Sequence, residues 1–539
     1  MKFDIFILFL FLINKIQASN ILAIWPVVSR THFTLGMTLF EKLAENGHTV
    51  TLVSPFEQRE THENIKLVKL GGTTEAALYG NRTSYLELRE LSVIQTLNER
   101  VKNGAAMADF TIQHEKLLNV LGSGEKFDLF IYDAYYNDAL LALAYFQKIP
   151  AIAFSCIGPN QQTNQLVKNP SNPSYDVNML LGLSDTTSFM NRVRNTAVSL
   201  VELFHYYFIY IPQQTKILKE NFNDLEDQKV PSIHDLIKNV NLVFINSHPL
   251  IQPARVHPPN SIEVGGMQLR TQNKEIHQDL NNIMDKAIYG IIYVSLGGNV
   301  RSIDLPKEKL DIFINVFTYL NSKDIVVLWK YEGIDLKERQ PHSTVIGPWM
   351  PQQEILAHKN LRAFITHGGL MSLMEAVHYA KPVIGIPIFN DQKHNMARVT
   401  SQGYGIQLDY DNLNEDMLKM AIDKIFNDTT YHDNAEKLSD HIKDNPIKAI
   451  DKAAWYVEHV IKTNGAEHLR ITATLLSCWK IHFIDQILLA LTFITSVIIT
   501  LLSIMKYSKV KFQKRRKSPQ HTIKVKAASS VRKNKFKSN

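Results

Sequence analysis

Short apolar runs alternate with amphipathic stretches through the first third of the chain. Each apolar run has the length of a buried strand, and the stretches between them repeat apolar residues at helical spacing. Parallel strands connected by helices are covered on both faces, so runs of this kind indicate a doubly wound α/β sheet. The expected strands are 21–28, 49–54, 127–133 and 151–156, and the expected helices are 35–46 and 138–146.

A second series of the same kind begins after an apolar run at 241–249. The Pro-rich stretch Pro249–Pro259 is the best candidate for a linker between the two series. Residues 158–239 are rich in Asn, Gln, Ser and Pro, show helical periodicity at 198–211, and follow neither series. The pattern predicts two tandem Rossmann-like domains that face a cleft. The expected strands of the second series are 291–295, 325–329, 363–366 and 383–388.

Two longer apolar runs lie outside this alternation. The run at 1–16 begins with Lys2, continues with about a dozen apolar residues and is followed by small residues, the pattern of a cleavable signal peptide over residues 1–18. A buried N-terminal strand is the alternative. The run Ile487–Met505 has 19 residues without a charge, enough at about 1.5 Å per residue to cross a hydrocarbon layer of about 30 Å. We therefore expect a transmembrane helix over 486–505.

Charge is distributed unevenly along the chain. The net charge of +7 arises from 59 Lys and Arg against 52 Asp and Glu, but the segment 506–539 alone holds 13 Lys and Arg and no acidic residue. The remainder has 46 basic and 52 acidic residues, a net of −6, so the folded part carries no nucleic-acid signature. Basic residues beside an apolar span mark its cytosolic side, so 506–539 is expected to be a cytosolic tail near anionic membrane lipid. The two cysteines, Cys156 and Cys478, are interpreted as unpaired thiols.

The stretch Trp349–Gln392 contains a phosphate-binding pattern. A strand is followed by the turn His367-Gly368-Gly369 and then by a helix, whose apolar residues recur at helical spacing. Free backbone N–H groups and the positive end of a helix dipole meet at such a turn, and both attract an anion. His367 adds a hydrogen-bond donor or a positive charge at the same point.

Further polar and aromatic residues of this stretch suit a nucleotide sugar. Ser372 and Glu375 are three residues apart and share one helix face, where the carboxylate can accept both hydroxyls of a ribose. Trp349 offers a flat ring on which a base can stack. Asp391-Gln392, after the following strand, can bind sugar hydroxyls. Each feature is common alone, but together they favour a site for a nucleotide-linked sugar.

The whole set resembles the signature box of the UDP-glycosyltransferase family, whose members have the two-domain GT-B fold. The family's box has 44 positions from its Trp to its last Gln, and Trp349–Gln392 has 44 residues. The residues in register are Trp349, Gln352, His367, Gly368, Ser372, Glu375, Pro387, Asp391 and Gln392. Met371 departs from the Asn of many members, and Lys359 stands where Pro is usual.

The resemblance extends beyond the box. The run Ser295-Leu296-Gly297-Gly298-Asn299 is similar to the family's Ser-Leu-Gly-Ser-Asn phosphate loop, but Gly298 replaces Ser and so removes one hydroxyl. The stretches 246–249 and 263–267 resemble insect members, and the apolar span with its basic tail resembles the membrane-bound animal branch. Residues that the resemblance implies for UDP-sugar binding are Ser295, Gly297, Gly298, Trp349, Gln352, His367, Gly368, Gly369, Ser372, Glu375, Asp391 and Gln392.

A catalytic pair is expected in the first domain. Ser29-Arg30-Thr31-His32-Phe33, with Gly47-His48 after it, resembles the family's Ser-His…Gly-His opening, whose first His is the general base. The stretch 127–134 resembles the one with the partner Asp, which implies Asp133. Independently of the family, His32 and Asp133 both follow strands whose carboxyl ends meet at one sheet edge, and a carboxylate orients an imidazole and raises its basicity.

Asp409-Tyr410-Asp411 matches the metal-binding Asp-x-Asp of another transferase class. Asn414, Glu415 and Asp416 follow as helix-capping residues, so a loop before a helix is the preferred interpretation, and no metal is expected.

The sequence thus predicts an inverting UDP-glycosyltransferase with a UDP-sugar as co-substrate and no cofactor. Insect-like features favour glucose over glucuronic acid. A transferase dedicated to one sterol or lipid, and a non-catalytic, membrane-tethered lipophile-binding protein of the same fold, are the alternatives. The expected parts are an acceptor domain over 19–250, a UDP-sugar domain over 251–450, a helical segment over 451–485, the span over 486–505 and the tail over 506–539.

The predicted topology is that of a type I protein of the endoplasmic reticulum membrane with its catalytic domains in the lumen. Two acceptor sequons for N-glycans, at Asn81 and Asn427, fall on the lumenal side. Lys535 and Lys537 resemble a dilysine retrieval signal. The acceptor, the physiological role and the formation of a homo-oligomer stay open.

Overall fold

The computed structural model describes residues 18–517, apart from 59, 72–84, 170, 223–229, 271–275, 334, 335, 337 and 482. The expected signal peptide, the sequon at Asn81 and the lysines near the chain end lie outside the described residues. The chain divides into a large unit up to Thr474 and a small unit from Leu475.

Seven parallel strands form the first sheet of the large unit, in the order β3-β2-β1-β4-β5-β6-β7. Successive residues of β4 alternate between the two faces: Phe130 and Tyr132 belong to one buried cluster, Leu129 and Ile131 to the other. Both faces are therefore covered, as the apolar runs predicted. The strands are β1 (Asn20–Ile24), β2 (Thr49–Ser54), β3 (Ile65–Lys69), β4 (Leu129–Asp133), β5 (Ala151–Ser155), β6 (Val240–Ile245) and β7 (Ser261–Glu263).

Helices connect these strands and cover the sheet. The first, α2, begins after Ser29 and buries Phe33, Met37 and Phe40 at helical spacing against the sheet. The helices are α2 (Arg30–Glu45), η1 (Tyr85–Glu90), α4 (Val93–Gln113), α5 (Glu115–Gly122), η2 (Asp138–Leu140), α6 (Leu141–Gln147), α7 (Gln161–Leu166), α8 (Phe189–His205), the π-helical η3 (Tyr206–Tyr210), α9 (Ile211–Phe222) and α10 (Ile233–Lys238).

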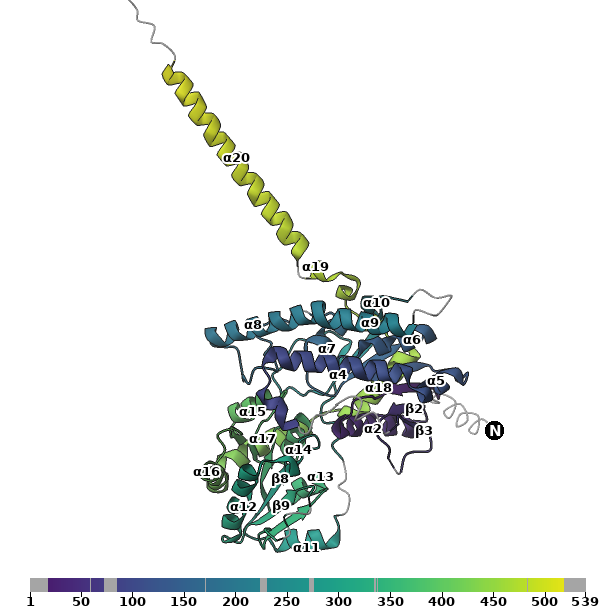
Figure 1. The fold of residues 1–539 in the computed structure, drawn as a ribbon, viewed down its shortest axis with the longest axis vertical. Helices are drawn as coiled ribbons and strands as arrows, with labels where there is room; N and C mark the ends of the chain where they lie inside the picture. The colour runs from purple at the N-terminus through teal and green to yellow at the C-terminus, as the bar shows by residue number, and fades with distance from the viewer. Residues whose placement is uncertain are drawn as a thin grey trace, which may run out of the picture. The chain divides into compact units, whose positions relative to one another are not determined.

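A second parallel sheet follows, in the order β10-β9-β8-β11-β12-β13 (Figure 1, teal to green). Its strands are β8 (Ile291–Ser295), β9 (Val326–Lys330), β10 (Thr344–Gly347), β11 (Leu361–Thr366), β12 (Val383–Gly385) and β13 (Gly405–Gln407). Its helices are α11 (Gln278–Lys286), η4 (Ser302–Asp304), α12 (Lys307–Asn321), α13 (Gln352–Ala357), α14 (Leu370–His378), α15 (Gln392–Ser401), α16 (Glu415–Asn427) and α17 (Thr430–Lys443).

The connection between the sheets differs from the prediction. The Pro-rich stretch Pro249–Pro259 connects β6 to β7, which pair within the first sheet, so it is not the linker between the sheets. The predicted boundary at residue 250 therefore falls inside the first sheet, and the chain passes to the second sheet after Glu263.

The chain later returns to the first sheet. Helix α18 (Ala449–Lys462) packs on α2, where Lys42 pairs with Asp451 at 3.2 Å and Asn46 Nδ2 donates to Glu458 Oε1 at 2.6 Å. The short helices η5 (Glu467–Leu469) and η6 (Thr472–Leu475) follow. The end of the large unit thus belongs structurally with its beginning, which the linear order of predicted domains does not reveal.

The small unit consists of the short helix α19 (Cys478–Ile481) and the long helix α20 (Ile484–Lys517), drawn in yellow in Figure 1. Among the described residues, α20 is the one helix that is long and apolar enough to cross a membrane; its most apolar part has a mean hydropathy of 2.6. The helix continues past Met505 into the basic segment, so the predicted span is part of a longer helix.

Candidate active site

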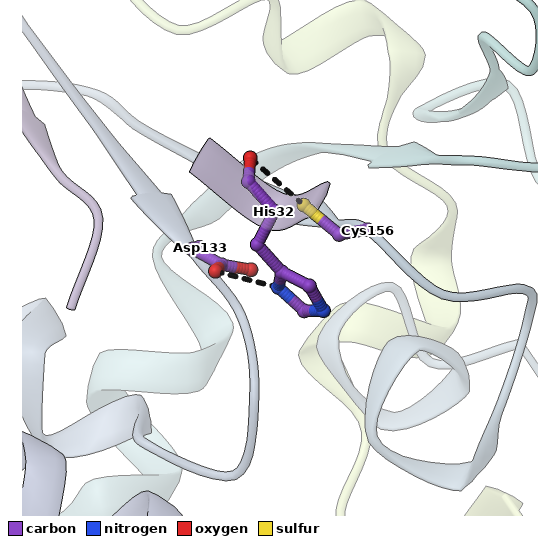
Figure 2. Close-up of side chains that lie close together, drawn as sticks. All are labelled: His32, Asp133 and Cys156. Atoms are coloured by element: carbon purple, nitrogen blue, oxygen red, sulfur yellow. Dashed lines mark hydrogen bonds and ion pairs between the residues drawn. The ribbon is translucent and has the colours of Figure 1, made fainter. Parts of the chain in front are cut away.

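His32 and Asp133 meet at the carboxyl edge of the first sheet. Ile24 in β1 lies opposite Tyr132 in β4, so the residues that follow these strands are neighbours. His32 Nδ1 lies 2.8 Å from Oδ2 of Asp133, whose side chain is fully buried (Figure 2). A carboxylate can only accept a hydrogen bond, so Nδ1 carries the proton and Nε2 keeps its lone pair. The pair has the geometry that a general base requires.

The backbone of His32 is held in place by the indole ring of Trp25. Trp25 Nε1 donates to the carbonyl oxygen of His32 at 2.8 Å, and the indole is almost fully buried. Gly36 faces the same ring, where a Cβ atom would lie 2.6 Å from the nearest indole carbon. The Cys156 thiol donates a long hydrogen bond of 4.0 Å to the same His32 carbonyl. These contacts fix the first turn of α2 and with it the direction of the imidazole.

The predicted phosphate turns lie side by side in the second sheet. Ser295, at the end of β8, lies opposite Thr366 at the end of β11, so the segments 296–299 and 367–369 emerge together. The imidazole of His367 lies between Gly297 and Gly369: a Cβ atom at the first would be 2.5 Å from His367 Cε1, and at the second 2.6 Å. Side chains are excluded there, so a ligand can approach the backbone closely, although the N–H of Gly297 itself donates to Ser295 Oγ at 3.4 Å.

His367 acts in this structure as a neutral side chain. Burial, together with the positive charge of Lys330, lowers the pKa of His367 to about 4. Of the two roles that the sequence left open, a hydrogen-bond donor therefore fits and a positive charge does not.

Lys330 is a residue of this site that the sequence prediction did not include. Its Nζ donates to the carbonyl oxygen of Gly297 at 3.0 Å and pairs with Glu332, whose other oxygen accepts from the backbone N–H of Ser302 at 2.8 Å. Lys330 ends the strand β9, so the rule that ligands bind at the carboxyl ends of parallel strands could have pointed to it.

The carboxylate of Glu375 is held in place by two glutamines. Gln352 Nε2 donates to one oxygen at 2.7 Å and Gln353 Nε2 to the other at 3.3 Å, while Gln352 also reaches Ser372 Oγ at 3.2 Å. Burial raises the pKa of Glu375 to about 7, although the two glutamine hydrogen bonds oppose this. The structure confirms that Ser372 and Glu375 share one face of α14, and it adds Gln353 to the predicted set.

Two cavities border this arrangement. His32 lines the first, together with Gly297, His367 and Asp391, so residues of both sheets face one space. Trp349, Gln353 and Glu375 line the second, larger cavity, and Trp349 is 77% exposed. Gly298 borders both cavities.

Asp391 and Gln392 line the first cavity, and some of their polar atoms already form hydrogen bonds within the protein. Gln392 Oε1 accepts from the backbone N–H groups of Ile388 at 2.8 Å and Phe389 at 3.0 Å. Asp391 Oδ2 accepts from Asn395 Nδ2 at 2.7 Å, and burial raises the pKa of Asp391. The side-chain oxygen of Gln392 therefore stabilises the loop before α15, and its side-chain nitrogen is the atom that can bind a ligand.

Side chains of the loop and helices around the first sheet contact loops that follow strands of the second. Ser29 Oγ donates to Asn299 Oδ1 at 3.2 Å, and buried Arg100 of α4 donates through Nη2 to Asn390 Oδ1 at 3.0 Å, next to Asp391. Arg100 was not predicted, because its partner lies 290 residues away and nothing local marks the contact.

The Asp409-Tyr410-Asp411 motif does not gather at the cavities. Asp409 Oδ1 accepts from the backbone N–H of Asn412 at 3.0 Å, and Asp411 pairs with Arg89 at 3.0 Å. Asn414 caps α16 by accepting from the N–H of Met417, as predicted. Asn427 is exposed at the end of α16.

Comparisons with known proteins agree with this geometry. A family model described as "UDP-glucoronosyl and UDP-glucosyl transferase" matches residues 27–518. UDP-glucosyltransferase 2 of Dactylopius coccus is 28% identical over 516 residues, 94% of this chain and 96% of the relative. An ecdysteroid UDP-glucosyltransferase of Spodoptera littoralis nuclear polyhedrosis virus is 27% identical over 90% of this chain and 97% of its own length.

A solved structure shares the fold. Os79 from O. sativa, in complex with U2F and trichothecene, aligns with a TM-score of 0.57 and 15% identity over 82% of this chain and 100% of its own. The two parallel sheets are thus those of the GT-B fold, as predicted.

Proposed function

Because the chain belongs to the family of UDP-glucuronosyl and UDP-glucosyl transferases, we propose that it transfers glucose from UDP-glucose to a hydroxyl of small lipophilic molecules. The observation that carries this proposal is that His32, which is bonded to buried Asp133, and the glycine turns around His367 line one cavity from opposite sheets. An acceptor hydroxyl and a nucleotide-linked sugar can meet there.

His32 is the general base of the proposed reaction. Its Nε2 accepts the proton of the acceptor hydroxyl while the oxygen forms a bond to the anomeric carbon and the bond from that carbon to UDP breaks. Asp133 holds the imidazole in this tautomer and stabilises the imidazolium. A single displacement inverts the configuration, so an α-linked donor gives a β-glucoside. General base catalysis contributes about 10² to 10⁴-fold to such a rate.

The second sheet stabilises the departing UDP without a metal. Gly298 and Asn299 line the same cavity as Gly369 at the N-terminus of α14, so backbone N–H groups of both turns and neutral His367 can donate to the departing phosphates. Glu375 accepts from the ribose hydroxyls and Trp349 stacks on the uracil ring. Asp391 and the amide nitrogen of Gln392 hold the sugar.

The two domains divide the substrates between them. The domain of the first sheet, which includes β7 and α18, binds the acceptor, and that of the second sheet binds the UDP-sugar. We place residues 19 to about 485 in the lumen of the endoplasmic reticulum, with α20 as the anchor, because the basic residues follow the apolar part of α20.

A product screen tests the function. Microsomes that contain the chain are supplied with UDP-glucose or UDP-glucuronate and a panel of phenols and alcohols, and products are identified by mass spectrometry and by sensitivity to a β-glucosidase. We expect hexose adducts of several lipophilic acceptors, formed at least about 10²-fold more slowly by His32→Ala. Formation of glucuronides alone would contradict UDP-glucose as the donor. A single sterol or lipid product would indicate an enzyme dedicated to that acceptor, and the absence of any product would favour a lipophile-binding protein.

A further inference from the structure

Three side chains with metal-ligating atoms, one of them that of the proposed base, lie close together (Figure 2). His32, Asp133 and Cys156 each offer one ligand atom, and these atoms all lie within 4.8 Å of one another. Cys156 follows β5, which pairs with β4 at Asp133, so the sheet itself brings the thiol beside the carboxylate. Among the residues that the structure describes, this is the one group of three or more His, Cys, Asp or Glu so closely placed.

The groups in this cluster are only partly engaged. Asp133 Oδ1 has no hydrogen-bond partner among the described residues, although the side chain is fully buried. The Cys156 thiol makes a long contact of 4.0 Å with the carbonyl oxygen of His32, and it also interacts with the side chain of Asp133 beside it. His32 and Cys156 both line the first cavity, so a small ion can reach them. A buried carboxylate oxygen without a donor is a strong attractor for a cation.

The donor set is selective for one class of ion. An imidazole nitrogen, a thiolate and a carboxylate suit zinc and cadmium, and magnesium prefers oxygen ligands alone. The thiolate and the carboxylate together neutralise a divalent charge, which removes the main cost of burying it. Ligand atoms of a tetrahedral zinc ion lie about 3.3 to 3.8 Å apart, so shifts of about 1 Å complete the geometry.

We propose that His32 Nδ1, the Asp133 carboxylate and Cys156 Sγ form an inhibitory site for a thiophilic divalent cation, represented by zinc or cadmium. The cation displaces the thiol proton to solvent. The proton of His32 Nδ1 moves to Nε2, because the imidazole stays neutral when Nδ1 binds the metal. Nε2 then has no lone pair and cannot accept the proton of an acceptor hydroxyl. Binding of the ion is independent of the proposed function, whereas the inhibition rests on it.

A reactive cysteine is the competing interpretation of the same cluster. Burial raises the pKa of the Cys156 thiol well above its ordinary value, and the negative charge of Asp133 adds to this effect. The thiol is therefore a poor nucleophile at neutral pH. A coordinating cation, in contrast, supplies the positive charge that deprotonates a bound thiol.

Inhibition of the full chain in microsomes tests the proposal first. Transfer is measured against increasing zinc, cadmium and magnesium, and then after addition of EDTA. We expect zinc and cadmium to inhibit reversibly and magnesium to have no effect. In Cys156→Ala, the zinc concentration that halves the rate should rise at least about tenfold. Cys478→Ala is the matched control, since the chain has two cysteines, and it should behave like the wild type. Equal inhibition of Cys156→Ala and the wild type would overturn the proposal.

Cobalt binding separates the site from the activity. Purified full-length protein in detergent is titrated with Co²⁺, and the thiolate-to-cobalt charge-transfer band is followed in the near ultraviolet. The band is expected in the wild type and in Cys478→Ala, lost in Cys156→Ala and weakened in His32→Ala. A wild type without the band would overturn the metal site. If the wild type shows the cobalt band but transfers no sugar, the metal site is supported and the proposed function is contradicted.

Discussion

The imidazole of His367 packs directly against the backbone of Gly297. Gly297 has φ of 93°, and a Cβ atom there would lie 2.5 Å from His367 Cε1. Both the backbone conformation and the contact therefore require glycine. The proposed phosphate loop and the turn after β11 therefore pack directly against each other.

Gly297→Ala is therefore expected to weaken UDP binding at least about tenfold, because a left-handed alanine costs about 1 kcal/mol or more and His367 must also move. Isothermal titration with UDP measures this. Gly298→Ala is the matched control: its Cβ atom would lie 3.8 Å from Thr31 Cγ2, in ordinary contact, so affinity should change less than about twofold. Equal losses in the two variants would contradict the role of the His367 contact.

Gly298→Ser should strengthen UDP binding. The same open space at Gly298 accommodates a serine side chain, whose hydroxyl can donate to a phosphate oxygen. One such hydrogen bond contributes about 0.5 to 1.5 kcal/mol, which corresponds to an affinity about 2 to 12 times higher. Titration with UDP checks this, and an unchanged dissociation constant would mean that the loop does not face the phosphates.

The expected strands omit the inner strand β6, most of whose residues fall in the run at 241–249 that was not assigned as a strand, and the four strands at the sheet edges. β3 and β7 end the first sheet, and β10 and β13 end the second. An edge strand pairs on one side only and is covered less completely, so it needs fewer apolar residues: β7 has three residues and β13 also three. The other inner strands are mostly apolar, which is why they were expected, although the runs 21–28 and 383–388 extend beyond β1 and β12.

The candidate site was predictable where its residues are close in sequence. The strand, glycine turn and helix around His367 form a local pattern, and so does the Ser372–Glu375 spacing. Arg100 and Cys156 could not be found in this way, because only the folded sheets bring them to Asn390 and to His32. The position of His32 and Asp133 after parallel strands supported their pairing, but the family resemblance was needed to select them, since the two residues are 101 positions apart.

UDP affinity should depend on pH through Glu375. Burial raises the pKa of Glu375 to about 7, and the ribose hydroxyls need the carboxylate form as acceptor. Raising the pH from about 6 to 8 converts most of this side chain to the carboxylate, so the dissociation constant of UDP should fall by up to about tenfold.

Two variants of Glu375 identify the source of that dependence. Glu375→Ala should weaken UDP binding by about 1 to 3 kcal/mol, the cost of losing charge-assisted hydrogen bonds. Glu375→Gln should also bind UDP weakly, and its dissociation constant for UDP should change much less with pH. If UDP affinity depends on pH as steeply in Glu375→Gln as in the wild type, the pH dependence belongs to another group. Unchanged UDP affinity in Glu375→Ala would exclude the ribose contact.

The proposed topology is testable at Asn427. This residue is exposed at the end of α16 and precedes Asp428-Thr429, so a lumenal orientation makes it an acceptor for an N-glycan. We expect an endoglycosidase that acts on high-mannose chains to reduce the apparent mass of the protein, with a smaller shift in Asn427→Gln. If neither Asn427 nor Asn81 carries a glycan, the lumenal orientation is contradicted.

Transfer should not require a metal ion. The proposed contacts to UDP are backbone N–H groups, His367 and the N-terminus of α14, and the Asp409 and Asp411 carboxylates are engaged elsewhere. Activity with EDTA is expected to equal or exceed the activity without it. Loss of activity with EDTA and its recovery with Mn²⁺ would assign a catalytic role to a metal.

The most direct measurement is the rate of glucosyl transfer by His32→Ala, made on preparations whose UDP affinity is determined in parallel. His32 lies in the first sheet's domain, and the groups assigned to UDP lie in the second, so removal of the imidazole should lower kcat at least about 10²-fold while the dissociation constant of UDP stays within about twofold of the wild type. A variant that keeps more than about a tenth of the wild-type rate would contradict His32 as the general base.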